Sequence, residues 1–256
     1  MLIGAGVRIL LSNDDGIEAA GLAALGRAVE GMGEVWTVAP ATEQSAKSHS
    51  FTMHEPLRVK RHDERRISVN GTPADAVYLA MHGLLPEKPD LVLSGINRGS
   101  NLGTDVHYSG TVAAAREAAN HDVPAVAFSL HLGHDTGQHA LWDTAIAVVR
   151  EVLALVSRHG VPPMTVLNVN IPNRPLGEIR GIRGATMSHR RYETLVREST
   201  DLRGQPYYWI GGPHLWFSGD HDADGPLCDE GFVTLTPLAL DMTDRKALDT
   251  LRSWER

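Results

Sequence analysis

Residues 7–40, VRILLSNDDGIEAAGLAALGRAVEGMGEVWTVAP, decide the fold class of this chain. The stretch opens with a short apolar run, which predicts a buried strand, and closes with a second β-rich run. Between them, apolar residues recur at helical spacing, and glycines end the pattern. The residues expected to face inward from this helix are Ala20, Leu22, Leu25 and Val29. A strand, a helix and a strand in this order predict a β-α-β unit.

The alternation of strand and helix continues to about residue 171. Further strands are predicted at PDLVLSGIN (89–97), VPAVAFSL (123–130) and MTVLNVNIP (164–172), and helices at TPADAVYLAMHGLL (72–85), SGTVAAAREAAN (109–120) and around 138–158. This regular order predicts an α/β fold, with a mostly parallel sheet and helices on both faces. In such sheets ligands bind at the carboxyl ends of the strands.

The pattern weakens beyond about residue 175. Residues 190–240 contain several aromatic side chains, many glycines and prolines, and only short β-rich runs. Such a segment often completes its packing on a neighbouring subunit, which predicts an oligomer contact. A loop and hairpin folded back on the same subunit explains the composition equally well. We therefore divide the chain into a core at 1–175 and a C-terminal, β-rich arm for oligomerisation at 176–256, which packs on the core.

The composition excludes several classes of protein. The chain is 42% hydrophobic and 21% charged, which is typical of a globular protein. Its net charge of −7 argues against a non-specific binder of nucleic-acid polymers, which needs a basic face. A single cysteine, Cys228, excludes an intrachain disulfide. MLIGAGVRILLS is interpreted as a strand rather than a signal peptide, and no apolar run is long enough for a membrane, so we expect a cytoplasmic protein.

Two adjacent carboxylates, Asp14 and Asp15, follow the first predicted strand. The loop after the second strand offers Ser45, and the strand 89–97 ends in Asn97. Because parallel strands end at one edge of a sheet, these oxygens can converge on one crevice. They form a hard ligand set, suited to one Mg²⁺ or Mn²⁺ ion, which would neutralise the adjacent charges. The alternative is that Asn-Asp-Asp-Gly serves only as a turn.

A second motif, SGINRGSNLGTDVHYSGTVAAA at 94–115, is typical of an anion site. Its glycines allow the backbone to approach a ligand, and Ser109, Gly110 and Thr111 begin a predicted helix. Free backbone N–H groups there can bind an anion, with Asn101 as a further donor. The alternative is that Ser-Gly-Thr merely caps the helix. A metal beside an anion pocket predicts a site for a phosphate ester.

Two further features carry weaker hypotheses. His107 lies beside the anion motif and is a candidate for substrate contact or proton transfer, although a structural role fits as well. DHDADG at 220–225 matches the beginning of a calcium loop. Its twelfth position is Gly231 rather than glutamate, so we interpret the segment as a solvated acidic loop.

Five motifs together resemble one known family. RILLSNDDG, VAPATEQSA, GTPADAVYLA, SGINRGSNLGTDVHYSGTVAAAREA and DEGFVTLTPL, in this order from about residue 8 to about 243, are similar to the survival protein E (SurE) family of metal-dependent 5′/3′-nucleotidases. The resemblance implies a Rossmann-like three-layer α/β/α core and a C-terminal arm exchanged within a homodimer or homotetramer. It also implies a divalent ion on Asp14, Asp15, Ser45 and Asn97, and a phosphate on Asn101, Ser109, Gly110 and Thr111. The segment DHDADGPLC departs from the family pattern, which leaves the oligomer size open.

The residues predict metal-assisted hydrolysis of a phosphomonoester, and the resemblance implies that the substrates are nucleoside 5′- and 3′-monophosphates, with short polyphosphate as a further substrate. Asp14 is expected to orient or deprotonate the attacking water, with Asp15 mainly a ligand; direct attack by Asp14 on phosphorus is a variant. Two alternatives place the same groups in a protein that is not an enzyme. One is a nucleotide sensor without turnover. The other is a receiver-like phosphoacceptor, which would need a third aspartate where this chain has Asn97.

Overall fold

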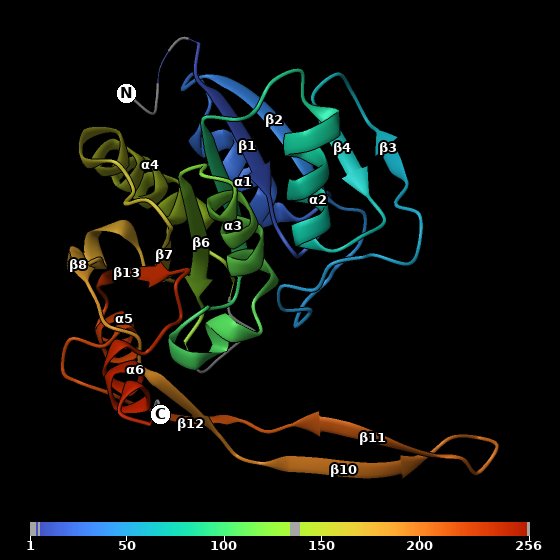
Figure 1. Cartoon of the computed structure of the whole chain (residues 1–256), viewed down its shortest axis with the longest axis vertical. Helices are drawn as coiled ribbons and strands as arrows, with labels where there is room; N and C mark the ends of the chain where they lie inside the picture. The colour runs from blue at the N-terminus through green and yellow to red at the C-terminus, as the bar shows by residue number, and fades with distance from the viewer. Residues whose placement is uncertain (1–3, 5, 134–138, 255–256) are drawn as a thin grey trace.

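The computed structural model of the chain describes residues 4, 6–133 and 139–254. Its centre is a nine-stranded sheet of order β3-β4-β2-β1-β5-β6-β7-β13-β8 (Figure 1). These strands are β1 (Arg8–Ser12), β2 (Glu34–Pro40), β3 (Val59–Arg61), β4 (Arg66–Val69), β5 (Leu91–Arg98), β6 (Ala125–His131), β7 (Thr165–Pro172), β8 (Ile182–Gly184) and β13 (Val233–Ala239). The predicted strands are therefore present, and the fold is α/β as expected.

The sheet is mostly parallel, which also confirms the prediction. The strands β4, β2, β1, β5, β6 and β7 run in the same direction, each paired parallel with its neighbour, and the register between β5 and β6 shifts between Ser94 and Asn97. The exceptions lie toward its two sides: β3 pairs antiparallel with β4, and β13 pairs antiparallel with β7. The carboxyl ends of β1, β2 and β5 consequently meet at one edge, where the candidate ligands follow.

Helices cover both faces of the sheet and give the molecule its three layers. They are α1 (Ala20–Ala28), α2 (Pro73–Leu79) with a π-helical turn at Ala80–Leu84, α3 (Gly110–Asn120) and α4 (Trp142–His159). Buried side chains of α1 and α4 share one core with the sheet, and those of α2 and α3 share a second core on the opposite face. Residue 138, where the long helix was expected to begin, lies outside the described residues.

One expected core position is wrong. Leu22, Leu25 and Val29 are buried as predicted, but Ala20 is exposed. The reason is Gly21, which packs directly on β5: a Cβ atom at this position would lie 1.9 Å from the carbonyl oxygen of Ile96. The face of α1 that packs on the sheet is therefore centred on Gly21. The spacing of the apolar side chains alone does not show this, and Ala20 lies outside the buried face.

The chain beyond residue 175 is divided between the sheet and an arm. Both β13 and β8 join the nine-stranded sheet, so the part of the chain beyond the expected boundary contributes to the core. The remaining strands are β9 (His189–Tyr192), β10 (Leu195–Thr200), β11 (Pro206–Gly211) and β12 (His214–Ser218). They pair as β9 with β12 and β10 with β11, which forms a long hairpin that extends away from the body (Figure 1). The division at residue 175 stays a prediction.

The segment 220–225 is the expected solvated loop only over its first half, where Asp220, His221 and Asp222 are exposed. Its last two residues begin the helix α5 (Asp224–Asp229), and Asp224 is buried. The Asp224 carboxylate accepts hydrogen bonds from the backbone of Gly103, from the backbone and hydroxyl of Ser188 and from the backbone of Gly225. The Asp224 carboxylate therefore links Ser188, at the base of the arm, to Gly103 in the core by hydrogen bonds. The chain ends in α6 (Arg245–Arg252), and no helix among the described residues is long and apolar enough to cross a membrane.

Candidate active site

The turn after β1 contains two residues that hold its backbone, Asn13 and Gly16, and two acidic residues between them, Asp14 and Asp15. The Asn13 side chain donates to the carbonyl of Gly16 at 3.0 Å and accepts from its N–H at 3.2 Å. Gly16 has a φ of +101°, which favours glycine. Because Asn13 and Gly16 close the turn, the adjacent carboxylates are not needed for it. The motif does form a turn, as the alternative has it, and the role of the two carboxylates as metal ligands stays a prediction.

Asp14 is buried beneath the beginning of α3. Its carboxylate accepts a hydrogen bond from the hydroxyl of Thr111. Burial raises the pKa of Asp14 to about 6, and the charge of Asp15 adds to the rise, while the hydrogen bond from Thr111 opposes it. A carboxylate with this pKa can exchange a proton near neutral pH.

Asp15 lies beside Asp14 and is less deeply buried. The backbone N–H of Arg98, at the end of β5, donates to Asp15 Oδ2 at 3.2 Å. Burial raises the pKa of Asp15 as well, and the negative charge of Glu43 contributes in the same direction, while Arg98 opposes it. Several carboxylates thus crowd together at the edge of the sheet, where a cation would relieve their repulsion.

The two neutral candidates reach the same place from opposite sides of β1: Ser45 lies in the loop after β2, and Asn97 lies in β5. The Ser45 hydroxyl donates to Glu43 Oε1 at 2.8 Å, which leaves its oxygen lone pairs for a ligand. The Asn97 amide donates to the carbonyl of Gly99 at 2.9 Å. Since its NH₂ group is engaged in this bond, the amide oxygen is the atom that Asn97 can offer to a cation.

A cavity of about 420 Å³ joins these groups, and we call it the acidic cavity. Six of the predicted site residues line it: Asp14, Asp15, Ser45, Asn97, Asn101 and Ser109. The cavity is therefore the place where the predicted metal ligands meet the predicted anion site. Gly110 and Thr111 do not line it and lie behind Asp14.

The beginning of α3 explains why Gly110 and Thr111 lie there. Ser109 caps the helix, because its hydroxyl accepts from the backbone of Val112 at 3.0 Å. A Cβ atom on Gly110 would lie 2.7 Å from Asp14 Cβ, so only glycine permits this packing. Thr111 directs its hydroxyl to Asp14. The turn thus serves as a cap, as the structural alternative proposed, and also positions Asp14; its contact with phosphate stays a prediction.

Asn101 is held by a buried polar network over β6 and β7. Its side-chain amide donates to the Ser129 hydroxyl at 2.7 Å, and its backbone N–H donates to the Asn170 amide oxygen at 2.9 Å. Asn168 and Asn170 both donate to its carbonyl. These contacts fix the backbone of Asn101 at the wall of the acidic cavity, as a binding residue requires.

The donor set fits a hard divalent cation. Within the described residues, no group of three or more His, Cys, Asp or Glu side chains is arranged to hold a metal. The acidic cavity instead offers a mixed set of carboxylate, amide and hydroxyl oxygens, which suits Mg²⁺ or Mn²⁺ rather than zinc. Burial raises the pKa values of Asp14 and Asp15, with smaller contributions from the neighbouring carboxylates Asp15 and Glu43 respectively, and a bound cation would favour the ionised forms.

The sequence did not identify several residues of the acidic cavity. Tyr108 stands directly before Ser109, so the anion motif itself could have suggested it. Tyr192 comes from the arm, and its hydroxyl donates to Asp105 Oδ2. Arg190 forms an ion pair with the same carboxylate at 2.7 Å. A contact between residues so distant in the chain leaves no local signal in one sequence. The first strand of the arm thus forms one wall of the cavity.

Of the two roles considered for His107, the position of its side chain fits the structural one. It does not line the acidic cavity; it lines a separate pocket on the other side of its short segment. Its backbone carbonyl accepts a hydrogen bond from the Ser48 hydroxyl at 2.6 Å. A direct part of His107 in proton transfer therefore has no geometric support, and its neighbour Tyr108 takes the position at the cavity.

Comparison with known proteins gives one consistent result. Residues 9–194 match the model of the family described as Survival protein SurE. Proteins named 5′-nucleotidase SurE from Geotalea uraniireducens (strain Rf4) and Gemmatimonas aurantiaca are 45% and 47% identical to this chain. Each alignment covers 97% of this chain, and 99% and 98% of the respective relative.

A solved structure agrees. The crystal structure of the SurE protein from Aquifex aeolicus superposes with a TM-score of 0.84 at 38% identity, covering 97% of this chain and all of that one. The match extends through the arm as well as the core. Sequence, fold and coverage lead to one conclusion: this chain belongs to the SurE family.

Proposed function

We propose that this chain hydrolyses nucleoside 5′- and 3′-monophosphates to nucleoside and phosphate, with one divalent cation per subunit. Its relatives are named 5′-nucleotidases, and the chain is accordingly a phosphoric monoester hydrolase. The observation that carries the proposal is the acidic cavity, in which hard oxygen ligands lie beside the beginning of α3. The proposal also includes activity on 3′-monophosphates and on short polyphosphate, which goes beyond the 5′-nucleotidase activity for which the relatives are named.

The charge of the cavity supports metal dependence. Asp14, Asp15, Glu43 and Asp105 all line it, so a phosphate dianion would meet several carboxylates there unless a cation offset their charge. We assign the cation to Asp14, Asp15, Ser45 and Asn97. When bound, a divalent cation polarises a phosphoryl oxygen and lowers the pKa of a coordinated water.

Asp14 is the residue proposed to orient the attacking water and accept its proton. Its pKa of about 6, raised by burial, leaves it ionised but basic at neutral pH. The Thr111 hydroxyl holds one carboxylate oxygen, which restricts the orientation of the side chain. Direct attack by Asp14 on phosphorus is the variant that a trapped phosphoenzyme would reveal.

The phosphate is proposed to lie against Asn101 and Ser109 at the wall of the acidic cavity, with Gly110 and Thr111 of the same predicted phosphate site directly behind it in the first turn of α3. The positive end of the α3 dipole favours an anion at this position, and the preorganised donors oppose the charge that grows on the phosphoryl oxygens. Because the nucleoside extends away from the phosphate, the exposed ring of Tyr108 is available to the base. The sequence contains no motif that selects one base.

The assembly is proposed to be a homodimer or homotetramer formed through the arm. The hairpin extends from the body and exposes large apolar side chains, including Val196 at 60% and Ile210 at 88% exposure. Such a surface is typical of an interface. We also propose that the protein is located in the cytoplasm.

The deciding experiment measures phosphate release from a panel of nucleoside 5′- and 3′-monophosphates with Mg²⁺ or Mn²⁺, and with a chelator as control. We expect metal-dependent release that disappears in Asp14→Asn. If every nucleotide stayed intact while one raised the melting temperature in the presence of metal, the chain would be a sensor and the proposal would be wrong.

A further inference from the structure

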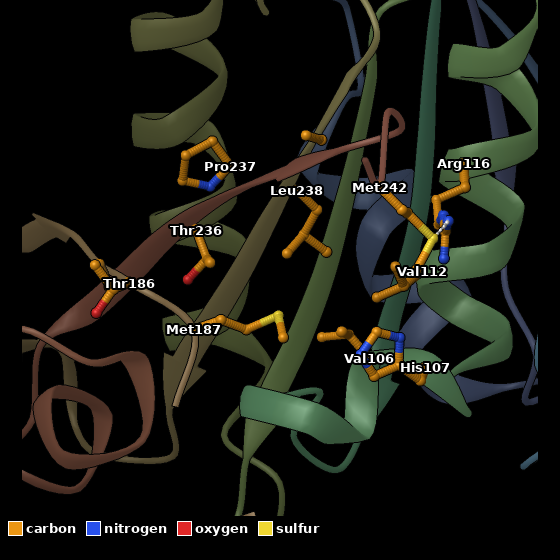
Figure 2. A pocket seen from close by; sticks show the side chains of 12 residues that line it. Val106, His107, Val112, Arg116, Thr186, Met187, Thr236, Pro237, Leu238 and Met242 are labelled. Atoms are coloured by element: carbon orange, nitrogen blue, oxygen red, sulfur yellow. Dashed lines mark hydrogen bonds between the residues drawn. The ribbon is translucent and has the colours of Figure 1, made fainter. Parts of the chain in front are cut away.

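A second cavity, of about 500 Å³, lies between α3 and β13. We call it the α3–β13 pocket. Figure 2 shows its lining: mostly apolar side chains such as Val112, Met187 and Leu238, with a few polar groups among them. None of its lining residues belongs to the acidic cavity. Its size and composition are those of a pocket for a small organic molecule.

Two polar groups in the α3–β13 pocket lack ordinary partners. Thr236 is 2% exposed, and its hydroxyl forms no hydrogen bond with the described part of the chain. Arg116 forms no ion pair with a carboxylate of residues 6–133 or 139–254; its guanidinium contacts the sulfur of Met242 at 3.7 Å (Figure 2). A buried hydroxyl without a partner is unfavourable unless a ligand completes it, and the partly exposed guanidinium can pair with an anion that enters the pocket.

The pocket and the acidic cavity share their walls. Asp105, Tyr108 and Ser109 line the acidic cavity, whereas Val106, His107 and Val112 line the α3–β13 pocket. A second segment behaves in the same way, because Met187 lines the pocket and Tyr192 lines the acidic cavity. The two cavities therefore lie back to back across the same two pieces of chain.

We infer that the α3–β13 pocket is a second ligand site, which binds an amphipathic organic anion. The apolar lining would receive the carbon body, Arg116 the carboxylate or sulfonate, and the Thr236 hydroxyl a further polar atom. A nucleotide is a poorer fit, because the pocket offers one guanidinium and no helix N-terminus for a phosphate dianion. Occupation of the site would alter the shared segments, and so would change the proposed hydrolysis.

The binding test uses anilinonaphthalene sulfonate, an aromatic sulfonate whose fluorescence rises in apolar surroundings. We expect saturable binding to the full-length protein. Arg116→Gln should weaken it about tenfold or more through loss of the charged hydrogen bond. Thr186→Phe, which places a ring at the edge of the pocket, should abolish it.

Two matched variants control for other surfaces. Arg158→Gln removes a positive charge from the exposed end of α4, and Ile210→Ser removes apolar surface from the hairpin; neither should change the affinity. Equal binding by the wild type, Arg116→Gln and Thr186→Phe would overturn the inference. The inference would also be overturned if the wild type bound no probe and Thr186→Phe changed the oligomeric state. That pair of results would mean that a second subunit fills the pocket.

The coupling rests on the proposed function, but the binding does not. We expect the probe to change the rate or KM of phosphate release in the wild type and to leave Thr186→Phe unaffected. Binding with an unchanged rate would overturn the coupling alone. A protein that binds the probe but hydrolyses no nucleotide would refute the proposed function and leave the second site in place.

Discussion

The hydroxyl of Thr111 donates a hydrogen bond to the carboxylate of Asp14, across 97 positions of the sequence. The bond joins the beginning of α3 to the end of β1 and fixes the residue that we propose as the base. Removal of the hydroxyl in Thr111→Val should lower kcat about 10- to 100-fold, the usual effect of losing a group that orients a ligand. Thr111→Ser keeps the hydroxyl and should retain most activity. Equal rates for both variants would contradict this role.

Asp14→Asn tests the chemistry itself. The amide keeps the size of the side chain but cannot take a proton from water and binds a cation poorly, so phosphate release should fall by at least about 100-fold. Native mass and far-UV circular dichroism should match those of the wild type, as for a folded variant. A variant that kept most of its rate would remove Asp14 from the mechanism.

The metal-free protein should become less stable as the pH rises from about 4 to 6. The pKa of Asp14 is about 6 in the folded state, against an ordinary value of 3.8, so the folded state holds the proton more tightly. That stabilisation is lost as Asp14 ionises, and the loss can reach about 3 kcal/mol. Urea denaturation with a chelator at several pH values measures it. Asp14→Asn should flatten the profile, and added Mg²⁺ should raise stability most above pH 6.

The loop that carries Ser45 is expected to depend on Glu117. His49, in this loop, contacts the nearly buried Glu117 of α3 at 2.8 Å. Ala46 and Ser48 have positive φ values, so the loop needs such contacts to keep its shape. Glu117→Gln should weaken metal activation several-fold and change kcat less at saturating metal. A fall in kcat without a shift in the metal requirement would contradict a positioning role.

The hairpin should govern assembly. Val196 and Ile210 face each other across β10 and β11 and are exposed in the single chain. Ile210→Asp places a charge in this apolar surface and should reduce the oligomer to a smaller species in light scattering. Thr200→Asp adds the same charge near the polar tip and serves as the control. An unchanged mass for Ile210→Asp would move the interface elsewhere.

Local chemistry made much of the fold predictable. Thr72 caps α2 with Pro73 in its first turn, and Ser109 caps α3, as their sequences indicate. The strand ends that carry Asp14 and Asn97 follow from the alternation of apolar runs and loops. These features depend on residues within a few positions of one another, which a single sequence displays directly.

The errors have a common physical origin in contacts between distant residues. The outward position of Ala20 follows from the contact of Gly21 with β5, and Asp224 is buried because Ser188 and Gly103 surround it. Tyr192 reaches the acidic cavity only because the arm folds back at its base. Periodicity and composition contain none of this, because tertiary packing decides which face of an element is covered.

The position of β13 matters for how the protein is made. This strand, Val233–Ala239, lies between β7 and β8 although it comes after every other strand in the described part of the sequence. During synthesis, all residues of the acidic cavity that precede the arm are therefore made before β13. Until β13 is made, the edge of β7 has no strand to pair with. Such an open edge invites pairing with other chains. Truncated or slowly translated chains should for this reason aggregate, even though their ligand-bearing loops are already present.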